Sequence, residues 1–338
     1  MGVRNSSAKL IPANSIAIVT RVGVGKLSVI SHNFSTSQDF LSLSDLNIDI
    51  WFGAYALYTK LQKELHTVQG TSIKGITKDE LLSKALKIPE SKEEQTAIGN
   101  FFRTLDSCIE INQRKHDCLK KLKAAYLQQM FPQAGESVPR VRFEGFSGEW
   151  EEVALGEIAE RVTRKNTNLE SGLPLTISAQ HGLIDQTDFF DKQVASRDVS
   201  GYFLIMNGEF AYNKSYSNGY PWGAVKRLDR YDMGVLSVLY IVFKPIAIES
   251  DFLVQYYETD KWHTEIIKYA AEGARNHGLL NISTSDFFKT ILVVPKNTKE
   301  QTSIGNFFRN LDTQITAQAD KIERLKQLKA AYLQKMFI

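Results

Sequence analysis

Cysteine is scarce in this chain, and its scarcity excludes several classes of protein. Only Cys108 and Cys118 occur among 338 residues, ten residues apart in a stretch that we predict to be helical. A helix would place them roughly 15 Å apart, which is too far for a disulfide. Together with six scattered histidines they form no metal-coordination pattern. The sequence therefore predicts free thiols in a reducing cytoplasm and no metal site.

Long apolar runs and a strong net charge are also missing. No run approaches the roughly 18 apolar residues of a membrane span, and the N-terminal residues lack the charged-then-apolar order of a signal peptide. The net charge is only +3, so the composition permits a polyanionic partner without requiring one. We expect a soluble cytoplasmic protein that is long enough for two domains.

Recognisable catalytic motifs are absent as well. Gly23-Val24-Gly25-Lys26 resembles part of a phosphate loop, but Leu27 stands where Ser or Thr is needed, so we interpret this segment as a turn between strands. There is no dinucleotide fingerprint, no Asn/Asp-Pro-Pro-aromatic motif of adenine methyltransferases and no acidic-lysine nuclease cluster. The sequence predicts a protein with no catalytic residues and no cofactor of its own.

One element is present twice. Residues 94–131 begin EQTAIGNFFRTLD and end KLKAAYLQQMF, and residues 300–337 begin EQTSIGNFFRNLD and end QLKAAYLQKMF. Aligned without a gap, the two segments are identical at about 24 of 38 positions, far above chance. The chain therefore contains an internal duplication.

Each copy has the periodicity of a helix. In the second copy, apolar residues recur at steps of three and four: Ile304, Phe308, Leu311, Ile315, Ile322, Leu325, Tyr332 and Met336. About 38 residues at 1.5 Å each give a rod of about 57 Å, which favours two long helices forming an antiparallel coiled coil. Asn112 and Gln318, at matching positions, are typical of polar residues that fix register. Two core helices in separate domains are the alternative interpretation.

The segment between the copies, residues 140–297, predicts a sheet-rich α/β (α+β) domain. Short β-rich runs alternate with turns: LPLTIS, YFLIMNGEFAYNK, WGAVKRL and GVLSVLYIVFKP. ESDFLVQYYETDKWHTEIIKYAA then predicts one helix that is capped by Ser250 or Asp251. A loop, EGARNHGLLNIS, and a short element, SDFFKTILVVP, lead into the second long helix.

The first 92 residues resemble the last part of that domain. IDIWFGAYALYTKLQKEL corresponds to the helix at 250–270, GTSIKGIT to GARNHGLLNIS, and DELLSKALKIP to DFFKTILVVP. By this alignment the first domain is partial and lacks about 55 to 60 residues at its start. A partial domain is expected to expose apolar surface, which makes self-association a further expectation.

The order of domain, long helix, domain and long helix resembles the specificity (S) subunit of type I restriction–modification systems, over nearly the whole chain. The two EQT(A/S)IGNFFR motifs are quite specific for that family, and SGEWEEVALGEIAE at 147–160 resembles the start of one of its target recognition domains. The resemblance divides the chain into a partial first target recognition domain at 1–92, a first conserved long helix at 93–132, a linker at 133–146, a second target recognition domain at 147–297 and a second conserved long helix at 298–338.

The resemblance implies a DNA-binding subunit without catalysis of its own. Each target recognition domain would read one half of a bipartite site in double-stranded DNA, and the helices would set the spacing and bind two methyltransferase subunits. Those partners would methylate adenine with S-adenosylmethionine, and motor-nuclease subunits would join for cleavage. The short first domain puts the reading of one half-site in doubt. The alternatives are a shortened scaffold that binds methyltransferase or a second copy of itself without reading a full site, and an autonomous enzyme, for which no motif is found.

Four polar clusters of the second domain are candidate DNA contacts: Arg161, Arg164, Lys165 and Asn166; Gln180 and His181; Asn213, Lys214, Tyr216, Ser217, Asn218 and Tyr220; and Arg275, Asn276 and His277. Three residues occupy roughly corresponding places in the first domain: Arg21, Lys26 and Lys74. Amide and guanidinium groups can read base edges, and lysine can meet phosphate. Polar turns between strands are more often merely solvated, which is the alternative for every cluster.

Overall fold

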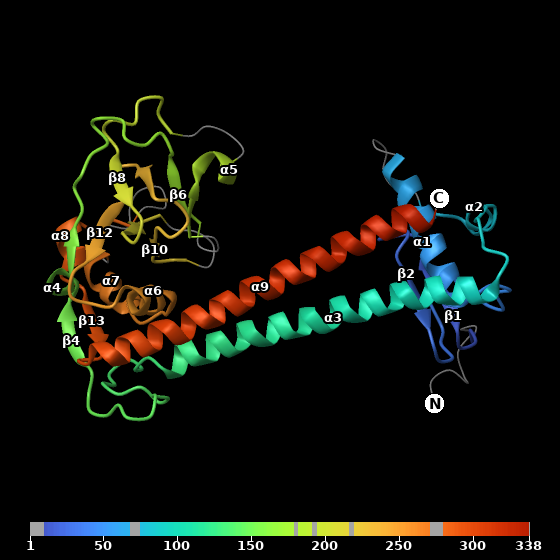
Figure 1. The fold of residues 1–338 in the computed structure, drawn as a ribbon, viewed down its shortest axis with the longest axis horizontal. Coiled ribbons are helices and arrows are strands. Elements are labelled where there is room, and N and C mark those ends of the chain that lie inside the picture. Colours follow the sequence, from blue (N-terminus) through green and yellow to red (C-terminus); the bar gives the residue numbers. More distant parts are fainter. Residues whose placement is uncertain are drawn as a thin grey trace. The chain divides into compact units, whose positions relative to one another are not determined.

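The computed structural model consists of two compact units. Unit 1 comprises Met1–Asp117 with Thr316–Ile338, and unit 2 comprises Cys118–Ile315. The structure describes residues 10–67, 75–178, 182–190, 195–215, 220–270 and 280–337. The two long helices each contribute to both units, and they are labelled with the other elements in Figure 1.

Unit 1 is a small sheet covered by a helix. Its strands β1 (Ser15–Val19), β2 (Leu27–Ile30) and β3 (Phe40–Leu43) pair antiparallel in the order β2-β1-β3, and α1 (Ile50–Thr67) and α2 (Lys78–Leu82) follow. The central strand is rich in β-branched residues and is almost fully buried, with Ile18 at its centre. A capping box of Thr77 and Glu80 starts α2.

The Gly23–Lys26 segment is a turn between two strands, as predicted. It connects β1 to β2, and both glycines have a φ of +84°, a conformation that favours glycine. A phosphate loop leads into a helix, whereas this turn leads into a strand.

Among its described residues, unit 2 contains a four-stranded antiparallel sheet and three two-stranded ones. The four-stranded sheet has the order β10-β9-β12-β5, formed by Ala224–Arg227, Phe210–Asn213, Ile241–Pro245 and Ala159–Arg161. The pairs are β11 with β8 (Met233–Leu236 and Phe203–Met206), β13 with β4 (Ile291–Val294 and Glu151–Ala154), and β6 with β7 (Leu175–Ser178 and Gly182–Asp185). The short helices are α4 (Leu155–Ile158), α5 (Gln186–Phe190), α6 (Ser250–Glu258), α7 (His263–Ala270) and α8 (Thr284–Phe288). This mixture of sheets and helices confirms the predicted α/β (α+β) class.

The prediction of one helix over 249–271 was wrong, because two helices, α6 and α7, occupy this stretch. Thr259 ends α6 with an extended backbone, and its hydroxyl donates to the Tyr256 carbonyl and accepts from the Lys261 amide. Such local side-chain bonds offer the backbone an alternative to helix continuation.

The expected cap of that helix was also wrong. The Glu249 carboxylate caps α6 by accepting from the Phe252 amide at 2.8 Å. Ser250 and Asp251 instead bind the Arg227 guanidinium, each at 2.8 Å. The two side chains that were expected to cap the helix are therefore bound to Arg227, Ser250 by a hydrogen bond and Asp251 by an ion pair.

The two predicted long helices are present as α3 (Lys92–Gln129) and α9 (Thr298–Met336). In unit 1, Lys329 binds Asp106 at 2.5 Å, and in unit 2, Lys123 binds Asp312 at 2.6 Å. Asp106 and Asp312 occupy the same position of the repeat, and so do Lys123 and Lys329, so each helix contributes the aspartate to one pair and the lysine to the other. Within each unit α3 and α9 pack antiparallel, as expected of the coiled coil (Figure 1).

The polar seam position also occurs as the sequence predicted. In unit 1 the Gln318 side-chain amide donates to the Asn112 side-chain carbonyl at 2.7 Å, and Gln318 is buried. Among the helices that the structure describes, none is long and apolar enough to cross a membrane.

Candidate DNA interface

Strand β9 ends at Asn213, the first residue of the third candidate cluster. The strand is buried through Tyr212, whose phenol donates to the Trp222 carbonyl at 2.9 Å. Burial raises the pKa of Tyr212 well above its ordinary value, so the phenol remains a proton donor. Tyr212 therefore ties the outgoing strand to the chain that returns after the loop.

The two arms of this loop approach each other closely. A Cβ on Gly223 would lie 2.1 Å from the Asn213 carbonyl oxygen, and Gly223 has a φ of +79°, so only glycine fits there. The Asn213 side-chain oxygen accepts from the Ser215 amide at 3.0 Å, and Tyr220 packs against the core on the returning arm. The candidates Tyr216, Ser217 and Asn218 lie outside the described residues.

Lys214 connects this loop to the segment that precedes α8. Its carbonyl accepts from the Leu280 amide at 2.9 Å, and its ammonium donates to the Ile282 carbonyl at 3.4 Å. The third cluster therefore contacts the chain at 280–282, which follows the fourth cluster in sequence. Arg275, Asn276 and His277 themselves lie outside the described residues.

The first cluster is largely engaged within the domain. Arg164 forms two hydrogen bonds of 2.8 Å to the buried carboxylate of Glu209, which also accepts from the Met206 amide. Asn166 is fully buried and exchanges hydrogen bonds with the Ser171 backbone, so its role is structural.

Lys165 is half-buried and Arg161 is exposed. The Lys165 ammonium lies 3.7 Å from the centre of the Phe203 ring and donates to the Gly201 carbonyl at 3.0 Å. Arg161 is an exposed residue of β5 and pairs in register with Phe243. These side chains remain available to a ligand because none is buried.

The first and third clusters lie at opposite ends of β9. Glu209, which holds Arg164, precedes the strand, and Asn213 ends it. At about 3.4 Å per residue this separates them by roughly 13 Å. The structure therefore does not gather them at one point. Gln180 and His181, between β6 and β7, lie outside the described residues.

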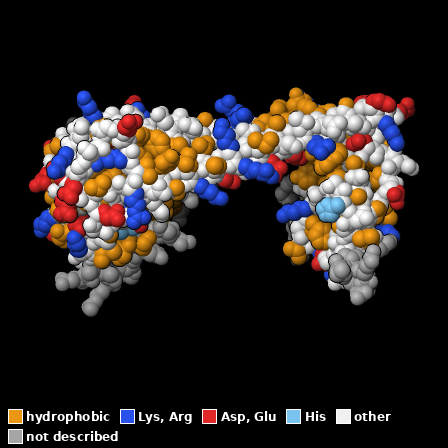
Figure 2. All heavy atoms as spheres, turned by 90° about the horizontal axis from the view of Figure 1, so that it is seen from below, with side chains coloured by type: hydrophobic (Ala, Val, Ile, Leu, Met, Phe, Trp, Pro, Cys, Tyr) orange, Lys and Arg blue, Asp and Glu red, His pale blue; other side chains and the backbone are white. Residues whose placement is uncertain are grey.

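The candidates of unit 1 are fewer. Arg21 forms an exposed ion pair with Asp39 at 3.3 Å, and Lys26 lies in the β1–β2 turn. Lys74 lies outside the described residues. On the face drawn in Figure 2, Lys and Arg side chains are interspersed with Asp and Glu on both units. Local groups rather than one broad basic surface would have to attract a polyanion there.

A family model matches the N-terminal third of the chain, and solved structures resemble nearly all of it. The family described as type I restriction modification DNA specificity domain matches residues 2–121. A putative type I specificity subunit of Mycoplasma genitalium is 24% identical over 213 residues, covering 62% of this chain and 55% of that protein. Residues 2–121 thus match the type I DNA specificity domain, and a longer part of the chain is similar to type I specificity subunits.

Other type I specificity subunits are similar to this chain in sequence and in fold. A putative type I specificity subunit of Mycoplasma pneumoniae is 23% identical over 62% of this chain and 56% of its own length. The chain therefore spans about half the length of these curated relatives. The crystal structure of a type I restriction–modification S subunit from M. genitalium covers 98% of this chain and 84% of its own, with a TM-score of 0.62 at 18% identity. At that identity the likeness establishes the fold.

A structure of a type I restriction–modification system, described by its complex assembly and conformational transition, has a similar fold. It matches 100% of this chain and 85% of its own, with a TM-score of 0.51 at 18% identity.

One hollow in unit 2 escaped the sequence analysis. Its volume is about 430 Å³, and Thr187, Ser196 and Arg197 are among the residues that line it. These residues come from segments without an identifiable motif, so no pattern in the sequence singled them out. Glu209 escaped for a similar reason, because it meets Arg164 across 45 residues of chain.

Proposed function

We propose that the chain is the DNA-binding specificity subunit of a type I restriction–modification complex. It reads the target site, carries two methyltransferase subunits and is joined by motor-nuclease subunits where the complex cleaves DNA. Residues 1–92 and 147–297 are the two target recognition domains, and 133–146 link the first long helix to the second domain. The similarity to type I specificity subunits supports this proposal. The main observation in its favour is that Lys214, in the 213–215 loop, forms hydrogen bonds with Leu280 and Ile282.

The chemistry of that junction suits base reading. Asn213 presents an amide and Lys214 an ammonium at the end of a rigid sheet, next to the segment that contains Arg275 and Asn276. Asparagine can pair with adenine and arginine with guanine in the major groove, while lysine neutralises a phosphate. Arg164, which is held by Glu209, orients the start of β9 and contributes charge rather than base contacts.

In this proposal the chain supplies no catalytic group and binds no cofactor. The methyltransferase partners carry out the transfer to adenine, and this chain decides which adenines they reach. Among the residues that the structure describes, no group of His, Cys, Asp and Glu could hold a metal ion.

The test is co-expression with the cognate methyltransferase subunit, followed by mapping of methylated adenines across a genome. A bipartite motif is the expected result, and it would mean that both domains read DNA. A single half-site or its palindrome would restrict reading to the second domain or require two chains. A stable complex without methylation would contradict the proposal.

A matched pair of variants sharpens the test. Lys214→Ala is expected to weaken binding to all sequences and to reduce the salt dependence by about one counterion. Lys289→Ala removes another lysine, which is exposed and pairs with Asp286 on α8, and should leave methylation unchanged. If the Lys214→Ala chain still binds the methyltransferase subunit, the loss of methylation is due to lost DNA recognition and not to misfolding.

A second candidate function is a scaffold that binds methyltransferase, or a second copy of itself, without reading a full bipartite site. The small domain of unit 1 favours it, since its described part holds one three-stranded sheet and its Arg21 is already paired with Asp39. Under this alternative, changes in unit 1 such as Lys26→Ala leave the methylated motif unaltered.

A further inference from the structure

We propose that a groove in unit 1 is the docking site for an arginine- and tryptophan-bearing segment of a separate polypeptide, which adds a β-strand beside residues 85–88. The model for this contact is the way in which residues 139–154 cover the corresponding surface of unit 2. The proposal does not depend on DNA reading.

In unit 2, an arginine of this covering segment neutralises a buried carboxylate. Arg142 binds both oxygens of Glu300, at 2.6 and 2.7 Å, and also donates to the Ser147 and Gly148 carbonyls. Glu300 is 1% exposed. An unpaired carboxylate at that depth would be strongly unfavourable, so Arg142 is required there.

The same segment then supplies a tryptophan and a strand. The Trp150 ring packs edge-on against Phe131 and Phe252, with centroids 6.0 and 5.9 Å apart. The next four residues form β4, which pairs antiparallel with β13 and leaves Leu292 and Val294 only 1% and 2% exposed. Arginine, tryptophan and strand together close one side of the unit 2 core.

Among the described residues of unit 1, the corresponding surface has no such cover. By the repeat alignment, Val294 corresponds to Ile88, which is 50% exposed. Residues 85–88 pair with no strand among the described residues. Glu94, the counterpart of Glu300, is exposed, and no ion pair of its carboxylate occurs in the part of the chain that the structure describes. In the described part of unit 1, a segment without a strand partner and a carboxylate without an ion pair therefore lie next to each other.

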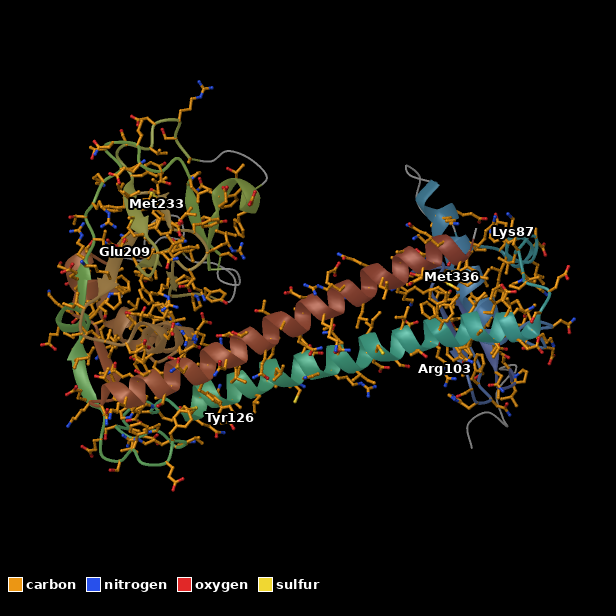
Figure 3. The ribbon with its side chains drawn as sticks, in the orientation of Figure 1. Lys87, Arg103, Tyr126, Glu209, Met233 and Met336 are labelled. Carbon is orange, nitrogen blue, oxygen red and sulfur yellow. The ribbon has the colours of Figure 1, made fainter. Side chains whose placement is uncertain are left out.

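Between them is a groove of about 670 Å³. It is lined by Phe52, Ile98 and Phe337, which correspond to the residues around Trp150 in unit 2, namely Phe252, Ile304 and Phe131. Lys87 and Met336, labelled in Figure 3, line it as well. Ala56 stands where unit 2 has Tyr256, which leaves additional room for a large ring.

The groove thus defines the chemistry of its occupant. Glu94 would need a cation once an occupant covered it, the apolar hollow accepts an aromatic ring, and the backbone at 85–88 accepts an extended segment. Lys60 and Lys63 also line the groove and favour acidic residues beside the tryptophan, as Glu149 and Glu151 flank Trp150.

A second copy of this chain is a poorer occupant than a separate polypeptide. Its own segment of this kind is engaged, since Trp150 is 4% exposed and Arg142 neutralises Glu300. Releasing the segment would uncover a buried carboxylate. A separate chain with a free segment of the same chemistry has no such cost.

The probe is a fluorescent peptide of residues 138–154, titrated into the full chain and followed by anisotropy. We expect saturable binding that Glu94→Arg weakens at least tenfold, while Glu93→Arg, at the exposed neighbouring position, leaves it unchanged. A peptide carrying Arg142→Glu should bind the Glu94→Arg chain better than the wild-type chain. Hydrogen exchange should slow at residues 85–88 on binding.

Three results would overturn the proposal. Absence of binding would show that the groove is not a docking site, and binding that is insensitive to Glu94→Arg would place the peptide elsewhere, for example by exchange into unit 2. A dimer of the chain alone that Glu94→Arg dissociates would make a second copy the occupant.

Discussion

The two units share the junction between domain and long helix but differ in how the domain is closed. In unit 1 the Gln95 side chain accepts from the Asp49 amide at 2.9 Å and donates to the Pro89 carbonyl at 2.8 Å. In unit 2 Gln301 makes the same two bonds, at the same lengths, to Glu249 and Pro295. The duplicated sequence therefore specifies the same contact, or joint, between long helix and domain in both units. The two domains differ in the rest of their surface.

The difference is largest where the segment at 139–154 covers unit 2. There Phe131 is enclosed by Trp150, whereas its counterpart Phe337 faces an open groove. Identical residues at identical repeat positions thus have different environments. The contribution of each phenylalanine to the free energy of unfolding should therefore depend on how far the ring is buried, although the residue type is the same.

The largest expected effect comes from truncating this phenylalanine in each unit. Phe131→Ala removes a fully buried ring that packs against Phe252 and Phe308, and should lower the unfolding free energy of unit 2 by about 3–5 kcal/mol. Phe337→Ala should cost unit 1 about half as much, because part of that ring is already exposed. Hydrogen exchange resolved by unit measures both. Equal losses would mean that the cover over Phe131 contributes nothing.

The next effect should be equal in the two units. A Cβ on Gly99 would lie 2.8 Å from the Phe52 amide nitrogen, and one on Gly305 would lie 2.9 Å from that of Phe252. Alanine at either position should therefore push the long helix away from its domain and lower the free energy of unfolding by about 1–3 kcal/mol. The higher helix propensity of alanine offsets about 1 kcal/mol of this loss. Asn100→Ala, at an exposed position next to Gly99, is the control. A tolerated Gly305→Ala beside a damaging Gly99→Ala would show that the joints are not equivalent.

Much of this joint could be predicted from the sequence, because a long periodic pattern occurs twice. The helices, the antiparallel packing and the polar seam at Asn112 follow from apolar spacing and from the alignment of the copies. The break at Thr259 and the cap at Glu249 did not follow. They depend on a local hydroxyl bond and on Arg227, which lies more than twenty residues away in sequence.

The candidate site shows the same limit. The loop at Asn213 was identified from its composition, but its contact with Leu280 depends on how the two segments fold together. Arg164 and Asn166 resemble ligand-binding residues in sequence, yet their partners are Glu209 and Ser171 of the same domain. Composition identifies polar side chains, and only the fold shows which of them are already engaged.

The smallest effect tests the symmetry of the helix pair itself. Lys123→Ala and Lys329→Ala each remove one ion pair, and the partner carboxylates, Asp312 and Asp106, are 42% and 43% exposed. Solvent screens such pairs, so each variant should lose only about 0.2–1 kcal/mol, and the losses should be equal and should shrink in high salt. Asp106 also accepts from the Tyr55 phenol at 2.6 Å, whereas Asp312 accepts a weaker bond of 3.3 Å from Gln255. If Lys329→Ala proves the more tolerated variant, Tyr55 holds that carboxylate without the lysine, and Tyr55→Phe combined with Lys329→Ala should then lose more than the sum of the two single changes.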